Sequence, residues 1–209
     1  ELGIDMTDRI PVAPAAHYTV GGVKTDLTGR TNIPHLYVCG ELASSGIMGA
    51  NRLASNSLIE CLVFGKRAVE DSVCNRREAP IPETTPLFSL NHQKLDAYLS
   101  LKNKVADIMT QEAGIIRTAN GLQEGLENLL HLEQTEIFEE NEYYSLVSKN
   151  LLTVAELIIR SALFRKESRG GHFRSDYPTP NDKYVCHIIQ QKGKEIKTTP
   201  VISKLKDKS

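Results

Sequence analysis

The sequence predicts an α+β fold in which a glycine-rich body of short strands and one helix precedes a three-helix up-down bundle. Residues 1–74 are rich in glycine and β-branched residues, whereas residues 95–168 are rich in Leu, Glu, Lys and Ala. The segment between them carries Pro80, Pro82 and Pro86, which is typical of a linker. We therefore expect four parts: the first body at residues 1–74, a proline-containing linker at 75–94, the bundle at 95–180 and an irregular, lysine-rich tail at 181–209.

The composition is that of an ordinary soluble globular protein. About 40% of the 209 residues are apolar and 25 basic residues nearly balance 26 acidic ones, which excludes disordered, collagenous and coiled-coil chains. A net charge of −1 gives no general attraction for phosphate backbones, so we expect no nucleic-acid partner. No window approaches the roughly 18 consecutive apolar residues that a membrane helix requires, and the first residues lack a signal-peptide pattern.

The cysteines, at positions 39, 61, 74 and 186, form no CxxC pair. This spacing fits neither a zinc site nor a small disulfide scaffold, so we expect no metal and a reducing, cytoplasmic setting. The chain starts at Glu1 rather than at a methionine, and we expect it to be a fragment of a longer protein.

Short strands bounded by glycines are expected in the first body. Residues 15–20 and 36–39 have strand composition, and residues 23–26 are expected to pair as a hairpin. A helix should begin at Ser57, because Ser57 and Glu60 have the spacing of a capping box. Its apolar stripe should lie against a sheet or another helix, and it consists of Leu58, Cys61, Leu62 and Val69, with Gly65 on the same face.

Three apolar patterns of helical period predict the bundle. They run over Tyr98–Ile108, Leu122–Leu130 and Val147–Ala162. The connections at Ala113–Gly114 and Gln134–Asn141 are short, so neighbouring helices should be antiparallel.

The densest group of unusual residues is the run Gly40–Ser57, where a strand leads into a glycine-rich loop and a helix follows. Free N–H groups at the start of such a helix favour an anionic or electron-rich ligand. Glu41, directly after the strand, is suited to accept hydrogen bonds from sugar hydroxyls, as acidic residues do in dinucleotide-binding folds. The alternatives are that Glu41 is a solvated loop carboxylate and that the residues at 55–57 only cap the helix.

Two further side chains are candidates for binding a substrate. Arg52 lies on the same loop, where it can clamp a carboxylate through two N–H groups or form a surface salt bridge. His17 can donate to a substrate oxygen, although a buried structural hydrogen bond is the commoner role for such a histidine. A second polar run, Arg165–Asp176, follows the last helix, and its spacing leaves open a solvated face, a domain-docking network or an active-site wall.

Three runs together resemble the succinate dehydrogenase/fumarate reductase flavoprotein family: His17–Gly22, Leu36–Glu41 and Gly49–Leu58. Within this family they are most similar to the L-aspartate oxidases, and the run Arg165–Pro178 resembles the C-terminal region of that group. The resemblance extends to about Pro180, but it corresponds to only the C-terminal part of such an enzyme. It implies that the first body is the C-terminal portion of a Rossmann-like FAD-binding domain.

The resemblance also implies roles for individual residues. FAD would be held noncovalently, with Glu41 at the adenosine ribose and the turn residues at the edge of the isoalloxazine ring, namely Ser55, Asn56, Ser57 and Leu58. His17 and Arg52 would be the catalytic residues that bind the substrate carboxylates. The implied reaction oxidises L-aspartate to iminoaspartate by hydride transfer to flavin N5, in the quinolinate route to NAD. Fumarate or oxygen would accept the electrons, and quinolinate synthase would be a partner.

The sequence departs from the family in two ways. Met48 stands where family members usually carry histidine, so any hydrogen bond from that side chain is lost. No Gly-x-Gly-x-x-Gly fingerprint precedes the matching motifs, and the family's capping domain is missing as well. We therefore expect this chain by itself to bind FAD weakly or not at all and not to turn over L-aspartate.

Two alternative functions remain. The first is a succinate dehydrogenase or fumarate reductase flavoprotein subunit, but Ala54, where those subunits more often carry glycine, and the short chain after Pro180 favour the oxidase. The second is a non-enzymatic helical interaction module, which would leave the flavin-type motifs unexplained.

For the second polar run, we expect Arg169 and His172 to help dock the bundle onto the flavin domain.

Overall fold

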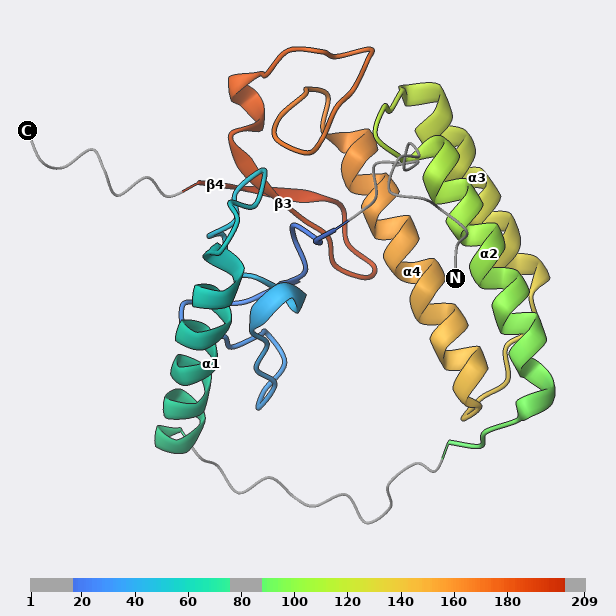
Figure 1. The fold of residues 1–209 in the computed structure, drawn as a ribbon, viewed down its shortest axis with the longest axis horizontal. Coiled ribbons are helices and arrows are strands. Elements are labelled where there is room, and N and C mark those ends of the chain that lie inside the picture. Colours follow the sequence, from blue (N-terminus) through green and yellow to red (C-terminus); the bar gives the residue numbers. More distant parts are fainter. Residues whose placement is uncertain (1–16, 76–87, 202–209) are drawn as a thin grey trace, which may run out of the picture. The chain divides into compact units, whose positions relative to one another are not determined.

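The computed structural model describes residues 17–75 and 88–201, which belong to two compact units that divide between Arg77 and Glu78 (Figure 1). Parts of the expectations made above lie outside these described residues. They are the start of the first expected strand at 15–16, most of the expected linker at 76–87 and the end of the expected tail at 202–209.

The first unit contains few strand residues. Strand β1 (Val23–Lys24) pairs in parallel with strand β2 (Ala43–Ser44), so the hairpin expected at residues 23–26 is wrong. The reason lies in Gly22, which has a φ of 144° and approaches Leu42 so closely that an added Cβ would be 2.3 Å from the Leu42 carbonyl oxygen. Only glycine permits this approach, and it leads the chain alongside the segment that precedes β2.

Residues 17–20 and 36–39 also do not form extended strands. Tyr37 makes only an isolated bridge with Arg30, and both side chains donate to Asp71 on helix α1 (Asn56–Cys74). The Tyr37 hydroxyl lies 2.7 Å from Asp71 Oδ2, and these hydrogen bonds, with Arg30 as the larger cause, lower the pKa of Asp71. Side-chain contacts with a helix therefore fix this turn in place of a strand ladder.

Helix α1 begins and packs differently from the expectation. Its N-cap is Ser55, with a left-handed φ of 72° and no side-chain capping bond, so the capping box of Ser57 and Glu60 is wrong. The expected stripe is wrong as well, because Leu58 and Leu62 are 67% and 68% exposed. The buried residues of the helix are Glu60, Phe64 and Ala68, which recur every four residues. The amphipathic pattern identified the helix but not the face that is covered within this unit.

The second unit contains the three expected helices. Helices α2 (Leu95–Glu112), α3 (Ala119–Thr135) and α4 (Tyr143–Phe164) lie side by side and run in alternating directions (Figure 1). Side chains cap two of them, since Thr118 Oγ1 accepts from Gly121 N and the Glu142 carboxylate accepts from Tyr144 N and Ser145 N. The buried core draws on all three helices and comprises Leu101, Val105, Ala113, Leu122, Leu126, Leu129, Leu152, Ala155, Ile159 and Ala162.

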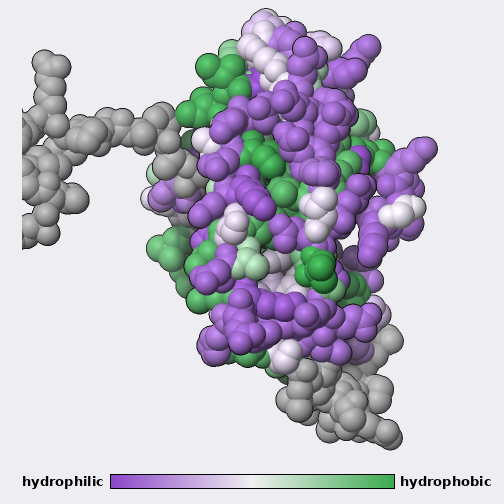
Figure 2. Space-filling model, turned by 90° about the vertical axis from the view of Figure 1, so that its right-hand side faces the viewer, coloured by the Kyte–Doolittle hydropathy of each residue, from purple (hydrophilic) through white to green (hydrophobic). Residues whose placement is uncertain are grey.

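The face of this unit that Figure 2 shows is mostly polar. Figure 2, which faces the side of the molecule where α2 and α3 lie in Figure 1, shows a largely hydrophilic surface interrupted by small hydrophobic spots. This is the surface expected of helices that bury one apolar face each. Within residues 17–75 and 88–201, no helix combines the length and the apolar character needed to cross a bilayer.

The segment after Pro180 is more regular than the expected irregular tail at 181–209. Strand β3 (Cys186–Ile189) pairs with strand β4 (Lys197–Pro200) in an antiparallel hairpin, after the 3-10 helix η3 (Asp182–Tyr184). Arg165 at the end of α4 donates to the carbonyl oxygens of Tyr184 and Cys186 at 2.7 and 2.9 Å. These long-range bonds, which the lysine-rich composition does not reveal, attach the hairpin to the helical core.

The core predicts a sharp contrast between two neighbouring residues of α4. Ile159 is fully buried and Ile158 is 38% exposed, so the two substitutions to alanine change the same chemical groups in different surroundings. Ile159→Ala should lower the free energy of unfolding by roughly 2–5 kcal/mol because it leaves a cavity, whereas Ile158→Ala should cost much less. Urea unfolding followed by helical circular dichroism measures both, and equal losses would contradict this packing.

Candidate functional site

Arg52 is held between two elements of the first unit. Its Nη1 donates to Ser57 Oγ at 2.9 Å, and its Cζ lies 4.5 Å from the centre of the Tyr18 ring. A guanidinium over an aromatic face is attracted by the ring quadrupole. The loop arginine is therefore oriented from one side by the segment after His17 and from the other by the first turn of α1.

Tyr18 is a contact that the sequence analysis missed. Burial is the largest cause that raises the pKa of its phenol, followed by the negative charges of Glu60 and Glu41. The phenol consequently stays protonated in neutral solution, and its ring is an uncharged platform for Arg52. His17 directly precedes Tyr18 and is exposed.

Glu41 lies in the 3-10 helix η1 (Gly40–Leu42), immediately before β2. Its Oε1 accepts a hydrogen bond from Thr19 N at 2.7 Å, which ties η1 to the segment that carries His17 and Tyr18. The backbone at Gly40 has a φ of 72°, and an added Cβ there would meet Cys61 Sγ at 3.2 Å. Glycine therefore lets η1 lie directly against α1.

The start of α1 keeps its first N–H groups free of a side-chain cap. Ser55 adopts a left-handed conformation, and Asn56 N approaches only the Leu53 carbonyl oxygen, at 3.3 Å. The Ser57 hydroxyl, expected to cap the helix, accepts from Arg52 instead. The structure thus brings Arg52 and Ser57 together, with His17 next to Tyr18 in the chain, while Glu41 contacts Thr19.

A buried carboxylate is the second feature that the sequence analysis missed. Glu60 on α1 is 3% exposed and accepts a hydrogen bond from Ser45 Oγ in the loop after β2. The sequence did signal that Glu60 belongs near the start of a helix. It gave no sign that the partner is Ser45 rather than the helix backbone.

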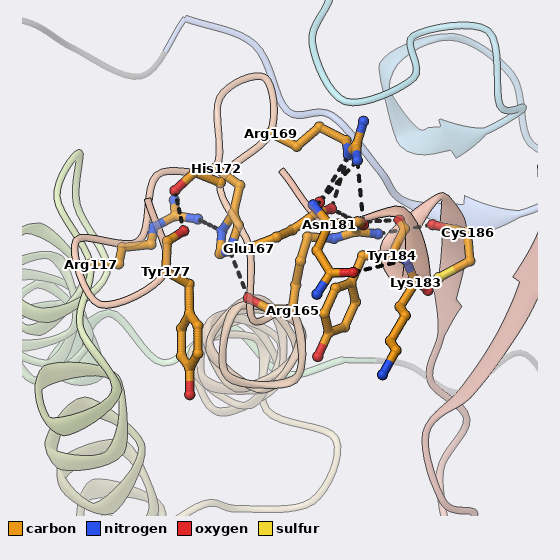
Figure 3. A network of polar contacts seen from close by, with 11 residues as sticks. Arg117, Arg165, Glu167, Arg169, His172, Tyr177, Asn181, Lys183, Tyr184 and Cys186 are labelled. Atoms are coloured by element: carbon orange, nitrogen blue, oxygen red, sulfur yellow. Dashed lines mark hydrogen bonds and ion pairs between the residues drawn. The ribbon is translucent and has the colours of Figure 1, made fainter. Parts of the chain in front are cut away.

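The second polar run forms a network inside the second unit (Figure 3). Glu167 is completely buried and accepts from Arg165 Nη1 at 2.6 Å, from Arg169 at 3.0 Å and from Asn181 N at 2.7 Å. These hydrogen bonds outweigh the effect of burial, which is the largest single influence, and lower the pKa of Glu167. The carboxylate therefore joins the segment after α4 to the segment before η3.

Arg174 is the other buried charge of the run, with 1% exposure. It donates to Asp176 through two nitrogens at 2.7 and 2.6 Å and to the Ala162 carbonyl oxygen at 2.9 Å. Asp176 also accepts from Ala119 N at 3.0 Å, and the Arg174 hydrogen bonds lower its pKa to about 2. The pair thereby connects the end of α4 to the start of α3.

His172 occupies a position with a defined tautomer. Arg117 Nη1 lies 3.0 Å from His172 Nδ1, and the Arg165 carbonyl oxygen lies 3.1 Å from Nε2 (Figure 3). Because a guanidinium only donates and a carbonyl only accepts, the ring is neutral with its hydrogen on Nε2. The partners of His172 and Arg169 named here all belong to the second unit, and docking onto another domain stays a prediction.

A family model described as an FAD binding domain matches residues 1–58, which include the strand–loop–helix site, so the first unit is of the flavoprotein class. A second model, described as the fumarate reductase flavoprotein C-terminal region, matches residues 102–207, about half of the chain. The chain belongs to the fumarate reductase flavoprotein family, whose cofactor is FAD.

The curated relatives that the chain resembles include several L-aspartate oxidases. The chain is 40% identical to an L-aspartate oxidase of Vibrio cholerae over 85% of its own length and 35% of that protein. It is 43% identical to L-aspartate oxidase 2 of Ralstonia nicotianae, covering 89% of this chain and 34% of that one. The chain therefore spans little more than a third of the length of the curated relatives that it matches.

Solved structures support the same family. A mutant E. coli quinol fumarate reductase superimposes with a TM-score of 0.75 at 27% identity, over 96% of this chain and 39% of that chain. A quinol-fumarate reductase with menaquinol gives a TM-score of 0.78 at 27% identity, over 98% and 41%. The likeness extends through both units and confirms a flavoprotein C-terminal region. The finer description, a Rossmann-like portion followed by an up-down bundle, is not tested by these comparisons.

The surroundings of His172 predict a pH dependence of stability. Burial and the nearby charges of Arg117, Arg165 and Arg174 lower the pKa of His172 below its usual 6.5. As the pH falls through 6.5, His172 binds a proton more readily in the unfolded chain than in the folded one. The free energy of unfolding should therefore fall as the solution is acidified from pH 7 to 5. Urea unfolding at both pH values should show a smaller drop for His172→Asn than for the wild type, and an unchanged drop would contradict the assignment.

Proposed function

We propose that the chain is the C-terminal part of an FAD-dependent L-aspartate oxidase, which oxidises L-aspartate to iminoaspartate. The similarity to L-aspartate oxidases at about 40% identity supports this choice of substrate. Because the relatives are more than twice as long, the activity is proposed for the full-length protein, and the 209-residue chain alone is expected to be inactive.

The observation that carries the proposal is the placement of Arg52. Its contacts with the Tyr18 ring and the Ser57 hydroxyl restrict the guanidinium before any ligand arrives. A restricted guanidinium binds a carboxylate through two parallel N–H groups with a smaller loss of conformational entropy. In this proposal Arg52 holds one carboxylate of L-aspartate and the exposed His17 donates to an oxygen of the substrate, so that the Cα–H bond faces the reacting atom of the cofactor.

The residues at the start of α1 fit FAD. The uncapped helix N-terminus offers N–H groups and partial positive charge, which suits the electron-rich edge of the isoalloxazine ring, and the residues there are Ser55, Asn56, Ser57 and Leu58. Glu41 has one oxygen engaged by Thr19 N and a second that can accept from the adenosine ribose. When bound, FAD supplies the hydride acceptor, and fumarate or oxygen then removes the electrons.

The proposal also includes a partner enzyme and a cellular compartment. Iminoaspartate is a reactive product, and quinolinate synthase is the enzyme that we propose to consume it in NAD synthesis. We place the reaction in the cytoplasm because the spacing of the cysteines fits no disulfide scaffold, as is typical of a reducing compartment.

A fumarate reductase or succinate dehydrogenase flavoprotein subunit is the second candidate. The superposition on quinol fumarate reductases at 27% identity favours it, whereas the higher identity to L-aspartate oxidases favours the first candidate. Both share the carboxylate-binding arginine, so the substrate must be tested directly. A purely structural helical module is less consistent with the organised Arg52 site.

Anaerobic reduction of the flavin in the full-length protein tests the proposed function. L-aspartate should bleach the visible flavin band, and succinate should not. Arg52→Ala should lower kcat/KM for L-aspartate at least about 100-fold, because it removes two hydrogen bonds between charged groups. Arg67→Ala, which changes an exposed arginine on α1, is the matched control and should keep the wild-type rate. Bleaching by succinate alone would assign the chain to the second candidate.

A further inference from the structure

Glu60 is a buried charge that the proposed function has not used. It lies in the second turn of α1 with 3% exposure, and its carboxylate accepts from Ser45 Oγ. The same hydroxyl oxygen lies 3.4 Å from Ile47 N, in the glycine-rich loop. One side chain of the helix therefore reaches the beginning of the loop that leads to Arg52.

Burying the Glu60 carboxylate beside an uncharged partner is energetically unfavourable. Removing a charged group from water is unfavourable unless hydrogen bonds and nearby positive potential compensate. Here the compensation in the described structure comes from the Ser45 hydroxyl, and the negative charge of Glu60 is one of the causes that raise the pKa of Tyr18. Glu60 thus holds the loop residue Ser45 by a hydrogen bond that an apolar side chain could not accept.

The loop needs such a constraint. Between the end of β2 at Ser44 and the start of α1 at Asn56, the chain contains Gly46 and Gly49, both with positive φ. Glycines widen the range of conformations that a loop can adopt, and fixing one residue inside it removes part of that freedom. The hydrogen bond between Ser45 and Glu60 fixes the loop at its first turn, seven residues before Arg52.

We propose that Glu60 is a positioning residue for the substrate site: by holding Ser45 against α1 it orients the loop that presents Arg52. This inference rests on the proposed function for the identity of the substrate, but not for the ordering of the loop. In this role Glu60 acts on the loop through Ser45.

Hydrogen–deuterium exchange in the full-length FAD-loaded protein tests the ordering directly. Glu60→Ala and Ser45→Ala should both speed exchange of the amides at residues 45–52 about tenfold or more, the equivalent of one hydrogen bond to a charged group. Glu60→Gln keeps an acceptor for the Ser45 hydroxyl and should restore slow exchange. Glu70→Ala on the same helix is the control, because Glu70 is exposed and pairs only with Lys66.

Steady-state kinetics separates positioning from a merely structural role. Glu60→Ala and Ser45→Ala should raise KM for L-aspartate about tenfold, while FAD affinity, measured by flavin fluorescence, stays within about twofold of the wild type. Slow exchange at 45–52 and an unchanged KM in both variants would overturn the proposal, even if the melting temperature falls. If Glu60→Ala does not fold, the smaller change Ser45→Ala decides.

The two proposals fail in distinguishable ways. A wild-type protein that does not respond to L-aspartate would refute the proposed function, and the exchange measurement would still accept or reject the role of Glu60. A wild type that oxidises L-aspartate, with Ser45→Ala indistinguishable from it in exchange and KM, would refute only the role of Glu60.

Discussion

The first unit depends on how helix α1 begins. In the second unit, the side chains of Thr118 and Glu142 accept hydrogen bonds from the first N–H groups of their helices and act as caps. Helix α1 instead begins with a left-handed Ser55 and no side-chain cap. This conformation leaves the Ser57 hydroxyl free to accept from Arg52, and it leaves the Glu60 carboxylate free to bind Ser45. The stability that a cap would contribute, about 1 kcal/mol, is given up at the place where a ligand can use the exposed N–H groups.

Buried carboxylates organise the loops of both units. Glu167 collects two arginines and a backbone N–H, whereas Glu60 has a single neutral partner in Ser45. Two guanidinium groups compensate the burial of the first charge, so removing either arginine would weaken that compensation inside the second unit. The second charge accepts from one hydroxyl, which is a weaker compensation. The network around Glu167 is therefore suited to rigid structure, whereas Glu60, in the role proposed for it, orders the loop that carries Arg52.

The sequence predicted the helices of the second unit because their apolar residues pack against one another, and all three helices lie in one stretch of the chain. Leu101, Leu122 and Ile159 recur at helical spacing and meet in one core. The same reasoning failed for α1. Periodicity identified Leu58 and Leu62 as the buried face of the helix, whereas the face that is buried within this unit contains Phe64. The capping box failed because Arg52 competes for the Ser57 hydroxyl. The candidate site was located from its motifs, yet the contacts of Glu41 with Thr19 and of Glu60 with Ser45 join residues far apart in sequence, and no local pattern records them.

The role proposed for Arg52 is compatible with both candidate functions. A guanidinium held by Tyr18 and Ser57 recognises a carboxylate, which L-aspartate, succinate and fumarate all possess. Discrimination between them requires a group that responds to the amine of L-aspartate. Of the acids in this unit, Glu60 accepts from Ser45, and Glu41 accepts from Thr19 N through one oxygen while its other oxygen is assigned to the adenosine ribose in the proposed function. In the proposed function, the part of the site described here orients a dicarboxylate, and groups from elsewhere in the full-length protein select the substrate.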